Sequence, residues 1–214
     1  MDDIVRQALA KWPNVPHCTG WLLLDRRGNW RMRDEAAQAR GAPGEPIRHA
    51  ALLAFINRNY EADPSGQWFF QNGPQRVYVE LGYTPWVVRL AAADDGGSGA
   101  SDGDGDDGGD GSLTLTLTDQ AGNAFEPVAA YLDDEGGVLF TDSSTPRRIA
   151  VLHDHDLDLF SEHAELAEDG HSGRFHWRDG ITLPLQPVTH ADVAARFGFV
   201  ASPAQAVVQK GAGL

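Results

Sequence analysis

The densest group of potential metal ligands in the sequence is the stretch "LHDHDLDLFSEH" at residues 152–163. His153 and His155 lie two residues apart among several carboxylates, and both side-chain types bind zinc and other divalent ions. The spacing argues against such a site, because Leu157 stands where the zinc motif His-x-His-x-Asp-His needs its aspartate. Acidic residues also stabilise the positive end of a helix and cap its free N–H groups. We therefore predict a helix start here and no metal site.

A second group of carboxylates lies in residues 94–112, which are almost entirely Asp, Gly, Ser and Ala. Asp102, Asp104 and Asp106 have the spacing that begins an EF-hand loop, but Leu113 stands where that loop needs a bidentate glutamate. This composition cannot bury enough apolar surface to offset the entropy of ordering the chain. The segment is therefore predicted to be a mobile, solvated loop, and weak binding of a hard cation stays open.

The sequence offers no convincing catalytic nucleophile or phosphate loop. Ser98 lies in a near-match to Gly-x-Ser-x-Gly, but Ala100 replaces the last glycine and the segment is the acidic loop. Cys18 follows His17 directly, and adjacent residues of an extended segment point apart. No glycine-rich phosphate loop precedes a predicted helix. We therefore predict that the protein uses no cofactor and is not an enzyme.

Aromatic, arginine and amide side chains are concentrated in two stretches, where rings could stack on a base and a guanidinium could hold a phosphate. The candidate ligand-binding residues are Arg33, Trp68, Phe70, Asn72, Arg76, Tyr78, Trp86, Arg174, His176 and Trp177. The alternative is that the aromatic residues, which recur with period two, form the core face of a sheet. Arg76 and Tyr78 are favoured, because they face away from the apolar Val77 and Val79.

Both stretches belong to a pattern that occurs twice in the chain. "SGQWFFQNG" begins at Ser65 and "SGRFHWRDG" begins at Ser172, and each ends in a strong hairpin turn signal. Asp25 and Gly28 also align with Asp133 and Gly136, which lie 108 residues later. We predict an α+β protein of two structurally repeated subdomains, each a mainly antiparallel sheet packed on one helix. The predicted divisions are residues 1–93, the acidic loop 94–112, and residues 113–214.

The formal net charge of −14 argues against coating long DNA or RNA, which needs a basic face. The single cysteine, Cys18, excludes an internal disulfide and favours a cytoplasmic location. Residues 1–14 contain no long apolar run, so we expect neither a signal peptide nor a membrane span. Residues after Ser202 are rich in Ala and Gly and predict a frayed tail.

The segments "GWLLLDRRGNW", "PIRHAALLAFINRNY" and "FFQNGPQRVYVELGYTPWVVRL" resemble a proteobacterial family of the domain-of-unknown-function kind. "LDDEGGVLF" and "GRFHWRDGITLPL" resemble it more loosely. The resemblance implies two repeated α+β halves, the second similar to pleckstrin-homology folds. It also implies a ligand site where the halves meet and a role in signalling. The acidic loop departs from the family pattern.

These observations favour a non-enzymatic small-ligand-binding or signalling module that takes an anionic or nucleotide-like ligand between the two halves. The second hypothesis is a protein–protein interaction scaffold that receives a partner strand at a sheet edge. The third is a metal-dependent hydrolase that uses the cluster around His153. The expected partner is thus a small anionic ligand or another protein, with no membrane and no long nucleic acid.

Overall fold

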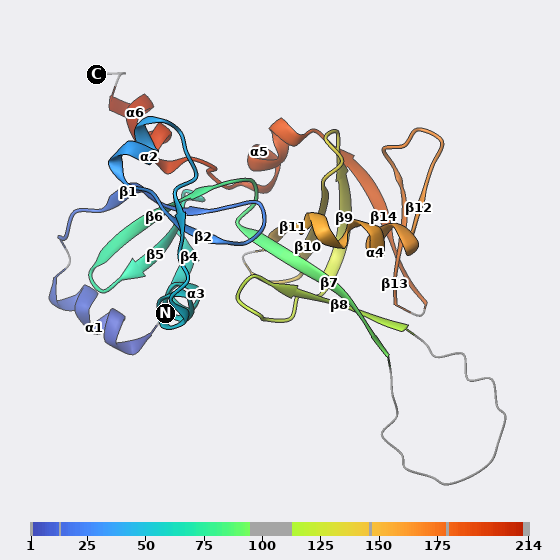
Figure 1. The fold of residues 1–214 in the computed structure, drawn as a ribbon, viewed down its shortest axis with the longest axis horizontal. Coiled ribbons are helices and arrows are strands. Elements are labelled where there is room, and N and C mark those ends of the chain that lie inside the picture. Colours follow the sequence, from blue (N-terminus) through green and yellow to red (C-terminus); the bar gives the residue numbers. More distant parts are fainter. Residues whose placement is uncertain (1, 13, 95–112, 146, 179, 212–214) are drawn as a thin grey trace, which may run out of the picture.

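The computed structural model describes residues 2–12, 14–94, 113–145, 147–178 and 180–211. Apart from Asp94, the predicted acidic loop lies outside the described residues. The chain forms two β-sheets that lie side by side, with helices around them (Figure 1). The predicted α+β fold class with two sheet halves is therefore confirmed.

The first sheet has six strands in the order β3-β2-β1-β6-β5-β4. Their bounds are β1 (Cys18–Leu24), β2 (Trp30–Met32), β3 (Glu45–Pro46), β4 (Tyr60–Ala62), β5 (Trp68–Asn72) and β6 (Gln75–Leu81). The central pair, β1 and β6, is parallel, and the other neighbouring pairs are antiparallel. Strands β5 and β6 form the predicted hairpin, but its turn lies one residue later than predicted. Asn72 pairs with Gln75 as part of the strands, so Gly73, with a positive φ of 56°, and Pro74 make the turn.

The second sheet has eight strands in the order β12-β13-β14-β9-β10-β11-β7-β8. Their bounds are β7 (Trp86–Asp94), β8 (Leu113–Asp119), β9 (Pro127–Asp133), β10 (Val138–Asp142), β11 (Ile149–Leu152), β12 (Ala164–Leu166), β13 (Gly173–Arg178) and β14 (Ile181–Val188). Six of these strands repeat the order of the first sheet, from β11 at the place of β3 to β12 at the place of β4. The parallel pair β9 and β14 matches β1 and β6. An origin by duplication stays a prediction.

Strand β7 does not close the first half, where the sequence analysis placed residues 86–93. It pairs in parallel with β11 and antiparallel with β8, so it belongs to the second sheet. The first sheet therefore ends with β6, and the chain passes to the second sheet through residues 82–85. The reason is long-range: β11 offers a free edge that β6, already paired on both sides, does not.

Helices surround the two sheets. Their bounds are α1 (Asp3–Lys11), α2 (Glu35–Ala39), α3 (Ala50–Arg58), η1 (Asp154–Asp156), α4 (Leu157–Glu162), η2 (His190–Asp192), α5 (Val193–Phe197) and α6 (Pro203–Gly211). The residues after Ser202 form α6 where we predicted a frayed tail. The Ser202 hydroxyl donates to Glu80 of β6 at 2.5 Å, and the Ala204 N–H donates to the same carboxylate at 3.1 Å. A carboxylate at a helix N-terminus stabilises its free N–H groups, so the start of α6 is fixed to the first sheet.

Two hydrophobic clusters explain the arrangement. The first fills the space between the sheets, with Leu24 and Val79 on one side, Leu139 and Val151 on the other, and Ile56 of α3. The second lies on the other face of the second sheet and includes Phe140, Phe160, Phe175 and Trp177. Strands β10 and β11 are buried along their whole lengths, because both of their faces meet a core. Near-continuous apolar strands are expected in that position.

The second sheet curls so that β13 and β8 approach each other. The Arg178 Nε of β13 lies 3.4 Å from the Leu115 carbonyl of β8, and the Arg178 guanidinium also pairs with Glu126 at 2.9 Å. Inside the curl, Phe160 of α4 stacks on Phe175 with ring centroids 4.8 Å apart. Helix α4 therefore covers the second core as α3 covers the first.

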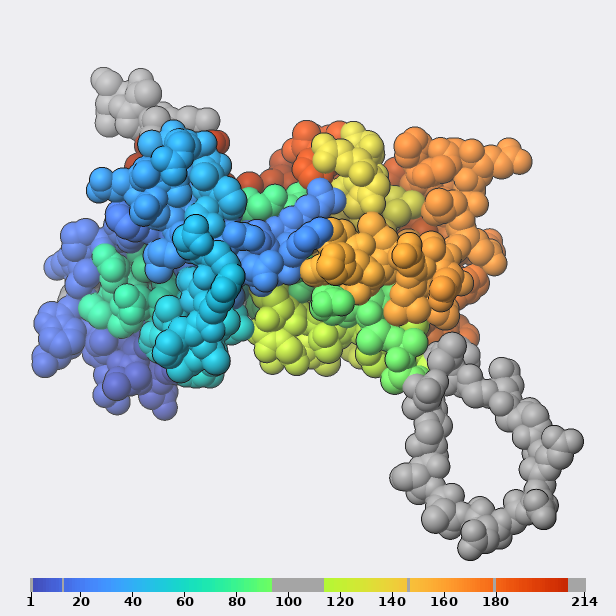
Figure 2. Space-filling view, viewed as in Figure 1, coloured from blue at the N-terminus to red at the C-terminus, as the bar shows by residue number. Residues whose placement is uncertain are grey.

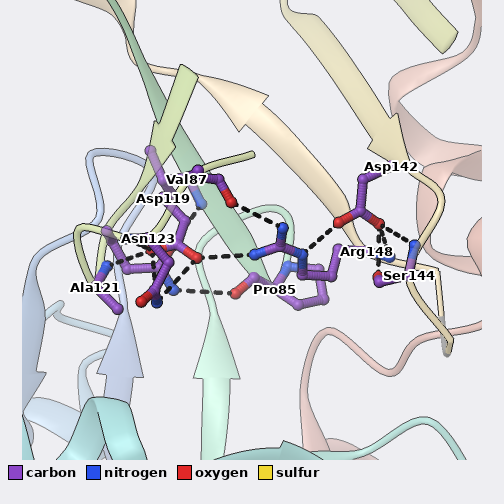
Figure 3. A network of polar contacts seen from close by, with 10 residues as sticks. Pro85, Val87, Asp119, Ala121, Asn123, Asp142, Ser144 and Arg148 are labelled. Carbon is purple, nitrogen blue, oxygen red and sulfur yellow. Dashed lines mark hydrogen bonds and ion pairs between the residues drawn. The ribbon is translucent and has the colours of Figure 1, made fainter. Parts of the chain in front are cut away.

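A half-buried arginine between two buried carboxylates fixes one end of the second sheet (Figure 3). Arg148 pairs with Asp119 at 2.9 Å and with Asp142 at 2.5 Å, and donates to the Ala124 carbonyl at 3.2 Å. Asp119 also accepts the backbone N–H groups of Ala121 and Asn123, which closes the turn after β8. Because both carboxylates are engaged with partners inside the fold, this cluster is structural.

Candidate ligand site between the sheets

A pocket of ≈ 430 Å³ opens at the junction of the two sheets. Its walls come from four segments: the β4–β5 hairpin, the connection after β6, the start of β11 with the residues before it, and the end of α5 with the residues after it. Small-molecule sites typically have volumes of roughly 300–1,000 Å³ and occur where two layers or domains meet. The pocket is lined by Ala62, Asp63, Pro64, Gly66, Trp68, Pro85, Arg147, Ile149, Phe197, Gly198 and Phe199.

Trp68 is the large flat side chain of this pocket. Its ring is backed by Tyr60, with centroids 4.8 Å apart, and by Trp86 at 5.6 Å in an edge-on arrangement. Tyr60 is itself fixed, because its hydroxyl donates to the Pro85 carbonyl at 3.0 Å. Such a network holds the Trp68 indole in place before any ligand arrives, which lowers the entropy that binding would cost.

Phe197, Gly198 and Phe199 form another part of the pocket wall. This segment is tied to the first sheet by the Val200 N–H, which donates to the Gly66 carbonyl at 2.9 Å. A Cβ atom on Gly66 would lie 2.3 Å from the Gly198 carbonyl oxygen, and Gly66 has a φ of 79°. Glycine is therefore required at position 66 for the wall to approach this closely.

The pocket carries one uncommitted cation. Arg147 is exposed, and no ion pair or hydrogen bond engages its guanidinium among the residues that the structure describes. Asp63, the carboxylate of the lining, accepts the N–H groups of Ser65 and Gln67 and the Tyr78 hydroxyl. Burial raises the pKa of Asp63, but these hydrogen bonds outweigh it and hold the pKa below its ordinary value. Asp63 therefore remains ionised but bonded within its turn, and Arg147 is left to meet a ligand.

Eight of the ten predicted site residues fall in three places, and Asn72 and Arg33 lie apart from these. Trp68 and Trp86 meet at the seam between the sheets, and Phe70 lies in the core behind them. Arg76 and Tyr78 both contact Phe69 on the opposite face of the first sheet. The Arg76 guanidinium lies 4.4 Å from the centre of the Phe69 ring, and the Tyr78 ring centre lies 5.9 Å from it. Asn72 is exposed at the turn after β5, and Arg33 donates to the Ala42 carbonyl at 3.0 Å.

The remaining three lie on β13, at the end of the second sheet that is farther from the first sheet (Figure 1). Trp177 is buried in the second core, whereas Arg174 and His176 are exposed. His176 contacts Glu165 of the neighbouring strand at 3.4 Å. One small ligand therefore cannot contact all three groups.

The cluster around His153 is assembled as a helix start. His153 Nδ1 accepts the His155 N–H at 3.1 Å, which makes His153 the N-cap of η1. Asp156 forms a bidentate pair with Arg89 and Asp154 pairs with Arg27. Within the described residues, no group of three or more His, Cys, Asp or Glu side chains could hold a metal ion. The hydrolase hypothesis therefore has no geometric support in this part of the chain.

A Tyr–Asp–His group at the seam joins the two halves. Tyr83 donates to Asp133 at 2.6 Å, and the His190 ring stacks on Tyr83 with its Nδ1 3.3 Å from the same carboxylate. Burial and the neighbouring carboxylate raise the pKa of Tyr83, so the phenol stays protonated. From the first sheet, the Arg26 guanidinium lies over the Tyr83 ring at 4.9 Å. The group ties the turn after β1 to the turn after β9.

The same turn also reaches the far side of the seam. Arg27 pairs with Asp154 of η1, and Figure 2 shows the blue hairpin tip against the orange surface of η1 and α4.

Cys18 is not favoured as a reactive thiol. Burial raises the pKa of its thiol, which makes the nucleophilic thiolate scarcer.

Sequence reasoning missed Arg147, Phe197 and Phe199. Arg147 stands next to Arg148, and the sequence does not show which of two adjacent arginines is buried. A glycine between two phenylalanines in "FGF" was the available signal for a tight segment, since Gly198 has a φ of 71° at the end of α5.

The fold and the site define a class: a two-sheet α+β protein with an aromatic pocket at the junction of its sheets. A family model described as "Protein of unknown function (DUF2946)" matches residues 1–204, and the chain belongs to that family. The predicted resemblance to a family of unknown function is thus confirmed.

Among solved structures, the chain is similar to a DUF1285 family protein from Silicibacter pomeroyi DSS-3. The two share 15% sequence identity with a TM-score of 0.49, over 88% of this chain and 97% of that chain. A search of curated proteins found no match. None of the helices in the described residues is long and apolar enough to cross a membrane.

Proposed function

We propose that this protein is a non-enzymatic, cytoplasmic small-ligand-binding module with a role in signalling, and that the pocket between its sheets takes a flat anionic molecule of the nucleotide-like class. The observation that carries the proposal is the meeting of Trp68 with the uncommitted Arg147 at one pocket of ≈ 430 Å³. A ring of the ligand would stack on the indole, and its anionic group would pair with the guanidinium.

The position of the pocket also supports a signalling role. Its lining residues come from both sheets and from both connections between them, so a bound ligand would contact all four segments at once. A ligand that contacts both sheets stabilises one relative placement of them. Binding would therefore shift the protein toward one conformation, which a partner protein could recognise.

Strand addition, the scaffold alternative, has less support. The longest strand at an end of either sheet order is β8, with seven residues. Its Leu117 carbonyl already accepts the Phe125 N–H at 2.9 Å, and its Leu115 carbonyl faces Arg178. Backbone groups that are already bonded cannot receive a partner strand.

The test is a thermal-shift and calorimetric screen of the full chain against nucleotides and aromatic carboxylates. A ligand that binds only the folded state raises the unfolding midpoint. Trp68→Leu should weaken binding of the best ligand by about tenfold, in line with roughly 1–3 kcal/mol for stacking one base. Trp21→Leu is the matched control, because Trp21 is 39% exposed on β1 and does not line the pocket.

The charge is tested separately. Arg147→Gln should weaken binding of the anionic ligand and leave binding of an uncharged analogue unchanged. Arg174→Gln should leave binding of both molecules unchanged. The proposal fails if no member of the panel shifts the midpoint, or if Trp21→Leu and Arg174→Gln weaken binding as much as the pocket variants do.

A further inference from the structure

A second pocket lies between β2 with the turn before it, the segment that leads into α3, α3 itself, and the turn after β8. It has a volume of ≈ 420 Å³. Its side chains are chemically different from those of the pocket at Trp68. Among the described residues that line it, none is acidic, although the whole chain carries a net charge of −14. Two of its lining residues are Arg31 and Arg48.

The bonds already made in this pocket leave donors free. Arg31 uses its Nε on Asp25 at 2.6 Å and one terminal nitrogen on the Gly44 carbonyl at 3.2 Å. Asn57 accepts the Trp30 indole N–H at 2.7 Å through its Oδ1, which turns its amide nitrogen away from that bond. Neither the Asn57 amide nitrogen nor the second terminal nitrogen of Arg31 has a partner among the described residues.

Arg48 supplies the net charge. The carboxylate of Asp25 offsets Arg31, whereas no ion pair or hydrogen bond engages the exposed Arg48 within the described part of the chain. Arg48 also lies two residues before α3, whose N-terminal end carries a partial positive charge. Arg31, Arg48 and Asn57 thus line the pocket from β2, from the segment before α3 and from α3, and donors of this kind bind the oxygens of a phosphate group.

We propose that this second pocket binds the phosphate group of a small phosphorylated molecule, with Arg48 as its principal charge partner and Arg31 and Asn57 as further donors. The site is separate from the pocket at Trp68, because the two share no lining residue. The proposal therefore stands or falls independently of the function proposed above.

The test is isothermal titration calorimetry of the full chain with inorganic pyrophosphate, which has the oxyanion and no ring. Arg48→Gln should weaken binding by about tenfold, the loss expected when one charge-assisted contact is removed. Because Arg48 is exposed, this variant should fold normally, which circular dichroism would verify. Arg174→Gln removes the same charge from β13, and Trp68→Leu alters the other pocket, so both should leave pyrophosphate binding within about twofold.

A second arm separates the free phosphate group from a phosphate carried on a base and sugar. If a nucleoside diphosphate binds through this site, Arg48→Gln weakens it and Trp68→Leu does not. Two results would overturn the proposal: no pyrophosphate binding at millimolar concentration in the unmodified protein, or an equal loss in Arg48→Gln and Arg174→Gln.

Discussion

The two sheets share a strand order but differ in what covers them. All five residues of β10 are buried, whereas in its counterpart β2 only Trp30 is buried. The second sheet has the first sheet on one face and its own curled edge with α4 on the other. Strand order alone therefore does not decide burial, since the layers that pack on each face decide it.

The polar groups of the two sheets differ in the same way. In the first sheet, Arg31 pairs with Asp25, and their side chains are 25% and 17% exposed. In the second, Arg148 pairs with Asp119 and Asp142, whose side chains are 0% and 5% exposed. Removing an ion pair or a hydrogen bond should therefore lower the free energy of unfolding more in the second sheet than in the first. Three measurements test this difference between the sheets.

The largest effect is expected from Arg148, because its two carboxylate partners are buried. Arg148→Met leaves two buried carboxylates without a cation, which should lower the free energy of unfolding by about 3–5 kcal/mol. Arg31→Met removes a partly exposed pair and should cost about 1 kcal/mol. Equilibrium urea unfolding of both variants measures the two losses. Equal losses of unfolding free energy would show that the greater burial of the carboxylates in the second sheet does not strengthen their ion pairs.

The next effect concerns the matching turn aspartates. Asp133 accepts the Tyr83 hydroxyl and the backbone N–H groups of Glu135 and Gly137, and Asp133→Ala leaves the Tyr83 hydroxyl and the Gly137 N–H buried and unpaired. We expect a loss of about 3 kcal/mol, against about 1–2 kcal/mol for Asp25→Ala, whose partners reach water more easily. The difference in denaturation midpoints tests this order. A larger loss in Asp25→Ala would contradict it.

The smallest effect is a pH dependence. Burial raises the pKa of Asp133, but hydrogen bonds from Tyr83, Gly137 and His190 outweigh it and leave the pKa below its ordinary value. The stabilisation is therefore complete above the unfolded pKa of about 4 and is lost as pH falls through the lower folded pKa. Unfolding free energies measured from about pH 6 to about pH 3 should fall less steeply in Asp133→Asn. An unchanged slope would mean that Asp133 titrates normally.

Turns could be predicted from the sequence because their chemistry is local. Gly28 and Gly136 have φ values of 79° and 84°, and each follows an aspartate that accepts the backbone N–H groups two and four residues on. The helix after Ser202 was predictable on the same grounds. Ser202, Pro203 and Gln205 form a capping sequence, and the Gln205 N–H lies 3.3 Å from the Ser202 hydroxyl.

Partner choice and pocket walls could not be predicted in this way. The alternation of β7 fits either sheet, and its place was decided by pairing with β11, where Trp86 lies opposite Ala150, 64 residues later in the chain. The aromatic concentration identified Trp68 and Trp86, because large rings stand out at any position. Arg147 and Arg148 are adjacent and identical in type. Only the fold shows that Arg148 is held by two carboxylates, whereas Arg147 has no ion pair with any residue that the structure describes.

The chain crosses between the sheets twice, once through residues 82–85 and once through the segment after β14. A single crossing would act as a hinge, but two crossings restrain rotation about either one. Pro85 stands on the first crossing and Phe197 and Phe199 on the second, so the same two tethers form walls of the pocket at Trp68. A cut in one crossing would leave the sheets joined through the other, and the pocket would lose one wall before the sheets could separate.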